Sequence, residues 1–366
     1  MQRVTYQNFQ LGFLLLILQG VFAQKTTDER ETLDYGQIYS HALDANVKDI
    51  FPLLEVDSEQ LSEEDALFIE NFNKRFKFEE DRSEYLKNKK SRIHDLQLIV
   101  REYWRKALLE PKNNFDDILA KEATAFLEKE YAAIKNRNIH RDSLGRLVSE
   151  YIESKGYHTT KEMGKTGRIF DLLVWESQRD SLYSFDLKNE EIQVKVVFMN
   201  DFVTLGWEEY ATFGKRYPGG WATNNAIYCV EEAYDLESEK FKISYLAHEG
   251  RHVADKKKYP NLKGPDLEYR AKLSELSLAQ KRVYNLLEAF TANANKNSKN
   301  PHPLANYCVI RDLSRLYFKL DFQKDVKSWK SVPPEKINRM ANKLLKKNTR
   351  ELQKRGASVE RIIRAK

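Results

Sequence analysis

The stretch Tyr245-Leu-Ala-His-Glu-Gly-Arg-His-Val-Ala-Asp255 places His248, Glu249 and His252 in the spacing His-Glu-x-x-His. Apolar residues recur around them at intervals of three and four, which predicts a helix. Side chains four residues apart lie one turn apart on the same helical face, so both imidazoles can bind one metal ion. The carboxylate of Glu249 borders that face, where it can reach a water molecule at the open position of a zinc ion.

The predicted helix has a core face beside its metal-binding face. The core face consists of apolar and small residues: Ile243, Leu246, Ala247, Gly250, Val253 and Ala254. His248 and His252 lie on a neighbouring face with Phe241 and Tyr245. Glycine inside a helix costs about 1 kcal/mol relative to alanine. We therefore expect a strand to pack closely against the helix at Gly250.

A hydrolytic zinc site needs a third protein ligand and leaves the fourth position to water. A second helix is predicted over residues 266–290, after a turn that contains proline and glycine. A hairpin of the two helices would bring Glu268 or Glu275 beside the histidines. Asp255 is a weaker alternative, because a straight helix carries it away from the ion.

The four residues His248, Glu249, His252 and Glu268 resemble the zinc-binding motif of the gluzincin peptidases, in which a glutamate on the following helix completes the site. The resemblance implies that His248, His252 and Glu268 bind Zn²⁺. It also implies that Glu249 is the general base, which takes a proton from the zinc-bound water and passes it to the departing amine. The motif covers roughly fifty residues, so it identifies a class of site.

The sequence departs from the gluzincin pattern one turn after Glu268. Several gluzincins have an acidic residue there that supports a metal-bound histidine, whereas this chain has Lys272. Asp255 or Glu275 would have to give that support, or it is absent. Glu275 is also the alternative third ligand. In a reading without metal, Glu268 and Glu275 lie on an exposed face and pair with Arg270 or Lys272.

Gluzincin-like enzymes use a tyrosine or histidine to stabilise the oxyanion that forms during hydrolysis. His302, between Pro301 and Pro303, is the first candidate and Tyr307 is the second. A histidine in a loop between prolines can equally be a solvated residue. The catalytic role predicted for both residues therefore rests on the resemblance.

The order of patterns predicts an α+β fold that is mostly helical, with a small mixed sheet packed on the His-Glu-x-x-His helix. The expected segments are a signal peptide (1–23), a helical N-terminal region (24–155), a zincin-like metallopeptidase domain (156–325) and a basic C-terminal helical segment (326–366). Four runs rich in β-branched and aromatic residues are the expected strands: 171–175, 182–186, 192–198 and 226–230.

In zincins an edge strand of the sheet pairs with an extended peptide substrate. Gly219-Gly-Trp-Ala222 is our candidate for a segment that lines the cleft, because paired glycines permit a close approach of another backbone. An ordinary loop with one buried tryptophan fits the same residues. The basic segment 326–366 has an apolar stripe, so we expect it to pack on the body, with contact to an anionic surface as the alternative.

Residues 1–23 have the pattern of a secretory signal peptide: Arg3, an apolar run over 11–22, and Val21-Phe-Ala23 before a cleavage site. The run is too short to span a bilayer, and no later segment is apolar enough to do so. We expect a secreted or periplasmic protein with no transmembrane segment after signal removal.

The composition, with 41% hydrophobic and 12% aromatic residues, is that of a globular protein with a large core. The only cysteines, Cys229 and Cys308, can form a disulfide or remain as buried thiols. The net charge of +6 is modest, and without a nucleic-acid motif we expect no nucleic-acid partner.

The sequence thus favours an exported zinc metallopeptidase, a hydrolase with a peptide or protein as its substrate. A non-catalytic exported helical binding protein with a structural or vestigial metal site is the alternative. Structural zinc sites have four protein ligands, whereas three and an open position are predicted here. Hydrolysis of other acyl groups is a third reading, since the sequence does not define the substrate pocket.

Overall fold

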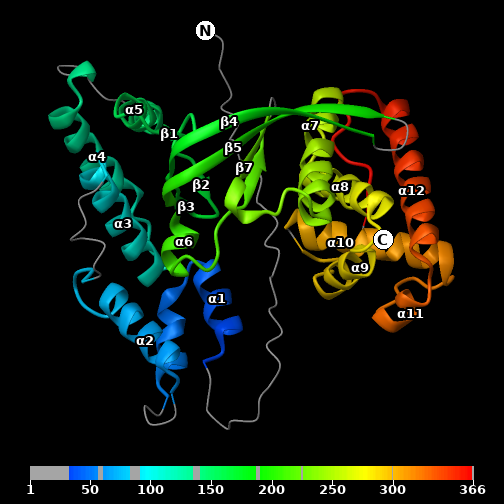
Figure 1. Ribbon diagram of the computed structural model, residues 1–366, viewed down its shortest axis with the longest axis horizontal. Coiled ribbons are helices and arrows are strands. Elements are labelled where there is room, and N and C mark those ends of the chain that lie inside the picture. Colours follow the sequence, from blue (N-terminus) through cyan, green and yellow to red (C-terminus); the bar gives the residue numbers. More distant parts are fainter. Residues whose placement is uncertain are drawn as a thin grey trace. The chain divides into compact units, whose positions relative to one another are not determined.

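The computed structural model describes residues 33–56, 61–82, 91–134, 141–186, 190–223, 226–298 and 300–364. The expected signal peptide, residues 1–23, lies outside the described residues. The observed class is α+β with a small mixed sheet, as predicted (Figure 1).

The chain forms two compact units. The first contains the described residues up to Gln178 and Met199–Pro218, and the second contains Arg179–Phe198 and the described residues from Gly219 onward. These units do not coincide with the expected segments 24–155, 156–325 and 326–366, because two long strands contribute residues to both.

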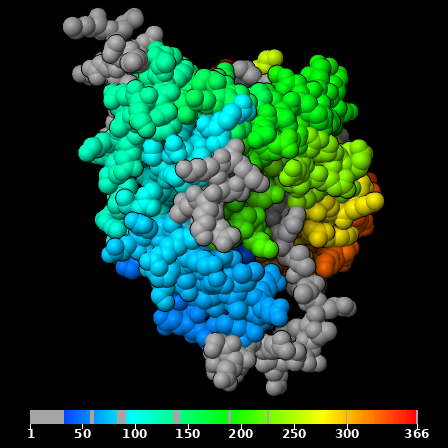
Figure 2. All heavy atoms as spheres, turned by 60° about the vertical axis from the view of Figure 1, so that its left-hand side comes forward, coloured from blue at the N-terminus to red at the C-terminus, as the bar shows by residue number. Residues whose placement is uncertain are grey.

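The first unit is mainly helical. Its helices are α1 (Tyr35–Leu43), η1 (Val47–Leu54), α2 (Glu63–Phe76), α3 (His94–Leu109), α4 (Asp116–Glu130), η4 (Ala132–Ile134), α5 (Arg141–Ser154) and α6 (Trp207–Ala211). Ser62 caps α2 by accepting a hydrogen bond from the backbone N–H of Asp65 at 3.1 Å. The helices share one apolar core, and their side chains form a closely packed mass, coloured blue to teal (Figure 2).

The five-stranded sheet has the strand order β1-β4-β5-β7-β6. Its strands are β1 (His158–Thr159), β4 (Leu173–Asp186), β5 (Glu191–Leu205), β6 (Gly220–Ala222) and β7 (Ala226–Val230). β4 begins at Leu173, inside the strand expected at 171–175, and continues through the strand expected at 182–186. β2 (Lys165–Thr166) and β3 (Ile169–Phe170) form a separate antiparallel pair. Strand β6 is the last in the order, so within the described residues it is an edge strand.

The second unit is built around α8. Its helices are η5 (Glu231–Ala233), η6 (Lys240–Ala247), α7 (His248–Lys258), α8 (Gly264–Leu278), α9 (Val283–Ala292), α10 (Pro301–Tyr317), α11 (Val326–Lys330) and α12 (Pro334–Arg355). Helices α7, α10 and α12 all contact α8 (Figure 1). Most residues of α8 are buried although many of them are polar. Polar side chains that are buried on several faces of a helix need hydrogen-bond or ion-pair partners, so such a helix indicates a functional site or a buried polar network.

The helix expected over 266–290 is two helices, α8 and α9. The side-chain amide of Asn338 donates to the carbonyls of Leu276 and Ala279 at 2.7 and 2.9 Å, which satisfies the end of α8. The carboxylate of Glu239 accepts hydrogen bonds from the backbone N–H groups of residues 280–282, before α9 begins. These two side chains are distant in sequence, so local patterns did not indicate the break.

Asp266, at which the second helix was predicted to begin, lies inside the first turn of α8, because the helix begins two residues earlier at Gly264. Its Oδ1 accepts hydrogen bonds from the backbone N–H groups of Ile362 and Ile363 at 2.9 and 3.0 Å. The C-terminal tail is thereby attached to the first turn of α8.

The basic segment is part of the second unit and packs on its other helices. The apolar side of α12 joins the same core as α9 and α10, through Ile337, Met340, Ala341 and Leu345. Cys229 and Cys308 are free, buried thiols. Burial raises the pKa of Cys308 to about 11. None of the helices in the described ranges combines the length and apolar character needed to cross a bilayer.

Candidate metal centre

A π-helical segment, η6, leads directly into α7. Its hydrogen bonds run between residues five apart, so the periodicity of an ordinary α-helix does not hold across it. Phe241 and Tyr245, expected on the face of the histidines, pack instead with sheet residues such as Val196 and Ile227. That part of the sequence interpretation was wrong because it assumed one α-helical period throughout.

Gly250 allows a strand residue to approach α7. A Cβ atom at this position would overlap the ring of Phe185 on β4. The expected close contact between a strand and the glycine is confirmed, although the contacting atoms belong to a side chain. Phe185 thus packs on α7 between the turns that carry His248 and His252.

The two histidines and Glu268 converge. The Nε2 atoms of His248 and His252 are 3.1 Å apart. Oε1 of Glu268 lies 3.1 Å from Nε2 of His252, and Oε2 lies 3.4 Å from Nε2 of His248. Ligand atoms in a tetrahedral zinc site, with bonds of about 2.0–2.2 Å, are about 3.3–3.6 Å apart. The spacing in the structure is therefore close to that of three ligands around one ion.

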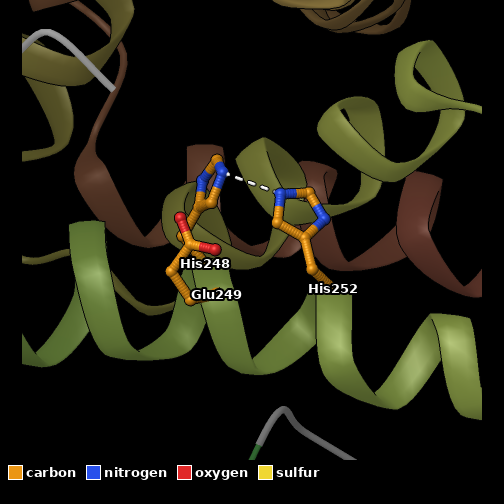
Figure 3. Close-up of side chains that lie close together, drawn as sticks. All are labelled: His248, Glu249 and His252. Carbon is orange, nitrogen blue, oxygen red and sulfur yellow. Dashed lines mark hydrogen bonds between the residues drawn. The ribbon is translucent and has the colours of Figure 1, made fainter. Parts of the chain in front are cut away.

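Glu249 lies on the same side of α7 as the two imidazoles, with its carboxylate beside His248 (Figure 3). Ligand atoms of these three residues lie within 4.8 Å of one another, and all three residues are buried. The His-Glu-x-x-His spacing thus gathers a cluster that can hold a metal, as predicted. Because it borders the ligand atoms, Glu249 is placed to exchange a proton with a molecule bound there.

Glu275 contacts the other ring nitrogen of His248. Its Oε1 is 2.7 Å from Nδ1, and the glutamate is fully buried. A carboxylate that accepts the Nδ1 proton leaves Nε2 as the metal ligand and fixes the ring. Glu275 therefore lies where support for a ligand is needed, and Glu268 lies where the third ligand is needed.

Asp255 is occupied elsewhere. Arg270 donates to both of its carboxylate oxygens, at 2.6 and 2.9 Å, and Arg251 lies 3.5 Å away. Asp255 is therefore neither a ligand nor a partner of His248 in this arrangement. The reading with an exposed glutamate face is wrong, because Glu268 is only 7% exposed and Glu275 is fully buried.

The charges of the buried groups favour a divalent cation. Glu249, Glu268 and Glu275 carry three negative charges when ionised, and Lys272, which is 3% exposed, carries one positive charge. With both imidazoles neutral, as metal coordination requires, the net charge is −2, which a divalent ion neutralises, and buried charge is costly unless it is paired. The pKa of His248 reflects this excess: burial lowers it, but Glu275 and Glu268 outweigh burial and raise it to about 10. Two imidazoles and one carboxylate are also typical ligands of catalytic zinc.

The structure separates the two predicted oxyanion stabilisers. Nδ1 of His302 lies 2.9 Å from Oε2 of Glu268, so His302 belongs to the centre. The ring of Tyr307 stacks on Phe322, with centroids 5.2 Å apart. No contact in the described part of the chain brings Tyr307 to the histidines, and His302 is the residue that we carry forward.

Lys272 is the residue of the centre whose position was hardest to predict. Its Nζ lies 3.8 Å from Oε2 of Glu268 and over the ring of Phe290. The sequence contained one signal, a lysine where the gluzincin pattern has an acidic residue. Spacing alone did not distinguish a buried lysine from an exposed one, because α8 is covered on nearly every side.

Strand β6 runs beside α7. It pairs with β7 in antiparallel register, Trp221 opposite Tyr228. Hydrogen bonds from Thr223 N to Ala226 O and from Val230 N to Gly219 O place the odd-numbered residues of β6 toward β7. Backbone groups alternate in such a pair, so those of Gly220 and Ala222 point to the opposite edge. The candidate cleft segment is therefore an edge strand. Within the described part of the sheet, the backbone groups of Gly220 and Ala222 face away from β7 and pair with no other strand.

Comparison of the chain with protein-family models, curated proteins and solved structures finds no match in any of the three.

Proposed function

We propose that the protein is a zinc-dependent metallopeptidase of the gluzincin type. The observation that carries this proposal is the convergence of His248, His252 and Glu268 at 3.1–3.4 Å with Glu249 beside them. The set offers three protein ligands, which is the number found in catalytic zinc sites, whereas structural sites have four.

The protein residues divide the chemistry between them. A Zn²⁺ ion held at this centre would lower the pKa of a bound water toward 7 and polarise a carbonyl group. Glu249 accepts a proton from the attacking water as the water oxygen bonds to the carbonyl carbon. It then returns a proton to the amine nitrogen as the C–N bond breaks. Glu275 holds His248 in the tautomer that presents Nε2.

The edge strand supports a peptide as the substrate. An extended peptide can form main-chain hydrogen bonds with the outward groups of Gly220 and Ala222. Because β6 lies beside α7, such a peptide would run past Glu249. A hydrolase of other acyl groups would not use these backbone groups, so peptides are the better-supported substrate class.

The competing function is a non-catalytic exported binding protein with a structural or vestigial metal site. The burial of Glu249 favours the enzyme. Burying a carboxylate that is not a metal ligand costs free energy, so its presence beside the site indicates that it takes part in the chemistry. Export to the periplasm or the outside of the cell is proposed on the signal-peptide pattern of residues 1–23.

The test combines metal content with peptide hydrolysis. We expect about one zinc per chain and hydrolysis of a quenched fluorescent peptide library. Glu249→Gln should keep the zinc and lose turnover by at least about 100-fold, whereas His248→Ala should lose both. A zinc-loaded wild type that cleaves no peptide, or a fully active Glu249→Gln enzyme, would refute the proposal.

A further inference from the structure

His302 lies at the start of α10, where two local features fix its position. The side chain of Asn300 caps the helix by accepting a hydrogen bond from the backbone N–H of His302 at 3.0 Å. Pro301 occupies the first helical position, which suits its fixed backbone angle. His302 therefore lies in the first turn of a helix and not in a loop between two prolines, as the sequence interpretation had it.

The first turns of α10 and α8 are packed closely together. Pro301 lies so near Gly264 that a Cβ atom on the glycine would be 2.8 Å from the proline Cγ. Gly264 begins α8, and Glu268 follows one turn later. This approach brings His302 to the carboxylate of Glu268.

The contact involves one carboxylate oxygen in particular. Nδ1 of His302 is 2.9 Å from Oε2 of Glu268, while Oε1 is the oxygen nearer to His252. The glutamate side chain is 9% exposed, and that of His302 is 20% exposed. Nδ1 is thus within hydrogen-bonding distance of a buried Oε2 that has no aligned hydrogen-bond donor among the described residues. A rotation of the imidazole that points its N–H at Oε2 would form a charge-assisted hydrogen bond to the carboxylate.

We propose that His302 is a positioning residue for the metal ligand Glu268, which it holds by donating its Nδ1 proton to Oε2. This inference rests on the proposed zinc site. It replaces the role in oxyanion stabilisation that the sequence suggested. A neutral imidazole carries one N–H, so when Nδ1–H is donated to Glu268 the Nε2 atom has no proton to offer an oxyanion.

The arrangement gives two of the three proposed ligands a supporting group. Glu275 orients His248 through Nδ1 at 2.7 Å, and His302 orients Glu268 through Oε2 at 2.9 Å. Loss of such a supporting group typically costs about 10- to 100-fold in metal affinity. Loss of a donor to an oxyanion would reduce turnover and leave metal affinity unchanged.

The experiment measures zinc affinity by competition with a chromophoric chelator, together with the visible spectrum of the cobalt-substituted protein. His302→Phe removes the donor, His302→Asn retains an N–H near the position of Nδ1, and His302→Gln places it near Nε2. We expect His302→Phe and His302→Gln to bind zinc about 10- to 100-fold more weakly and to change the cobalt spectrum. His302→Asn should stay near the wild type. Tyr317→Phe, at the far end of α10, is the matched control.

Several results would overturn the inference. Wild-type zinc affinity in His302→Phe, with kcat strongly reduced, would return His302 to oxyanion stabilisation. An equal loss of affinity in the Phe and Asn variants would show that the hydrogen bond is not responsible. A wild-type protein that binds no zinc would instead refute the proposed function, and the chelator titration detects that before any variant is compared.

Discussion

Arg270 donates two hydrogen bonds to the carboxylate of Asp255, from Nε to Oδ2 at 2.6 Å and from Nη2 to Oδ1 at 2.9 Å. Both residues are about 1% exposed. Asp255 follows His252 on α7, and Arg270 follows Glu268 on α8. The ion pair therefore joins the two helices that supply the proposed ligands, one turn or less away from them.

Breaking this pair on one side should destabilise the protein strongly. Asp255→Asn removes the negative charge that pairs with the buried Arg270. Removing one partner of a buried ion pair costs about 3–5 kcal/mol. Urea denaturation of the metal-free protein measures the free energy of unfolding. The double variant Asp255→Leu with Arg270→Met should lose less than Asp255→Asn, because no buried charge is left unpaired. A loss below about 1 kcal/mol in Asp255→Asn would show that the pair does not hold the helices together.

Glu275 and Glu268 should respond differently to the same chemical change. Glu275→Gln weakens the hold on His248 and should reduce zinc affinity by about 10- to 100-fold. Glu268→Gln removes a ligand and should reduce it much further. Chelator competition on both variants makes the comparison direct. The reverse order of effects would make Glu275 the third ligand.

The spacing of the motif was sufficient to predict the positions of His248, Glu249 and His252, because helical geometry within one turn is local. The presence of a following helix with a nearby glutamate was also predictable. The choice between Glu268 and Glu275 was not, because the two are seven residues apart and share a helical face. Only the packing of α8 against α7 distinguishes the one that reaches Nε2 from the one that reaches Nδ1.

Features that depend on distant contacts were beyond the sequence pattern. The break between α8 and α9 is stabilised by Asn338 and Glu239, which are far from it in the chain. The π-helical turns of η6 changed the face occupied by Tyr245. The length of β4 reflects pairing in the sheet, so two short patterns became one strand. In each case tertiary hydrogen bonding or packing decided between locally similar options.

Lys272→Met should increase the stabilisation that zinc gives. Lys272 is the buried positive charge beside Oε2 of Glu268, at 3.8 Å. Its removal makes the net charge of the empty centre more negative, which destabilises the metal-free protein and favours the bound cation. Thermal denaturation with and without zinc should show a Tm difference that exceeds that of the wild type by about 1–2 °C, which corresponds to about 1 kcal/mol for a chain of this length. An unchanged or smaller difference would contradict the charge balance argued for the centre.

Asp171, in the first unit, should make stability depend on pH. Burial raises its pKa from 3.8 to about 6, against the hydrogen bonds that its Oδ1 accepts from the N–H groups of Trp207 and Leu172. A raised carboxyl pKa means that the folded state holds the proton more tightly. Its contribution is therefore full below pH 3.8 and is lost as the pH rises through about 6.

Asp171→Asn removes this titration and keeps the acceptor oxygen. Between pH 4 and 7 we expect the variant to gain about 2–3 kcal/mol in unfolding free energy relative to the wild type, measured by urea denaturation. Glu208, whose pKa burial raises to about 7, titrates in both proteins and largely cancels in the comparison. A difference that does not change with pH would show that Asp171 does not titrate in this range.

Gly250→Ala tests whether the space at the glycine is reserved for Phe185. Alanine improves helix propensity by about 1 kcal/mol, so a simple helical glycine would be stabilised by the change. A methyl group here overlaps several atoms of the Phe185 ring, and overpacking of a core typically costs about 1–3 kcal/mol. The overlap should prevail, with a net loss of about 1–2 kcal/mol in unfolding free energy.

The double-mutant cycle with Phe185→Leu separates these two effects. The smaller and more adaptable leucine leaves room for the methyl group, so Gly250→Ala should cost less in that background or become stabilising. Zinc affinity supplies a second readout, because a displaced α7 would move His248 and His252 with it. If Gly250→Ala stabilises the protein in both backgrounds, Phe185 does not occupy that space, and the packing of β4 on the metal-binding helix is not what keeps the two histidines in place.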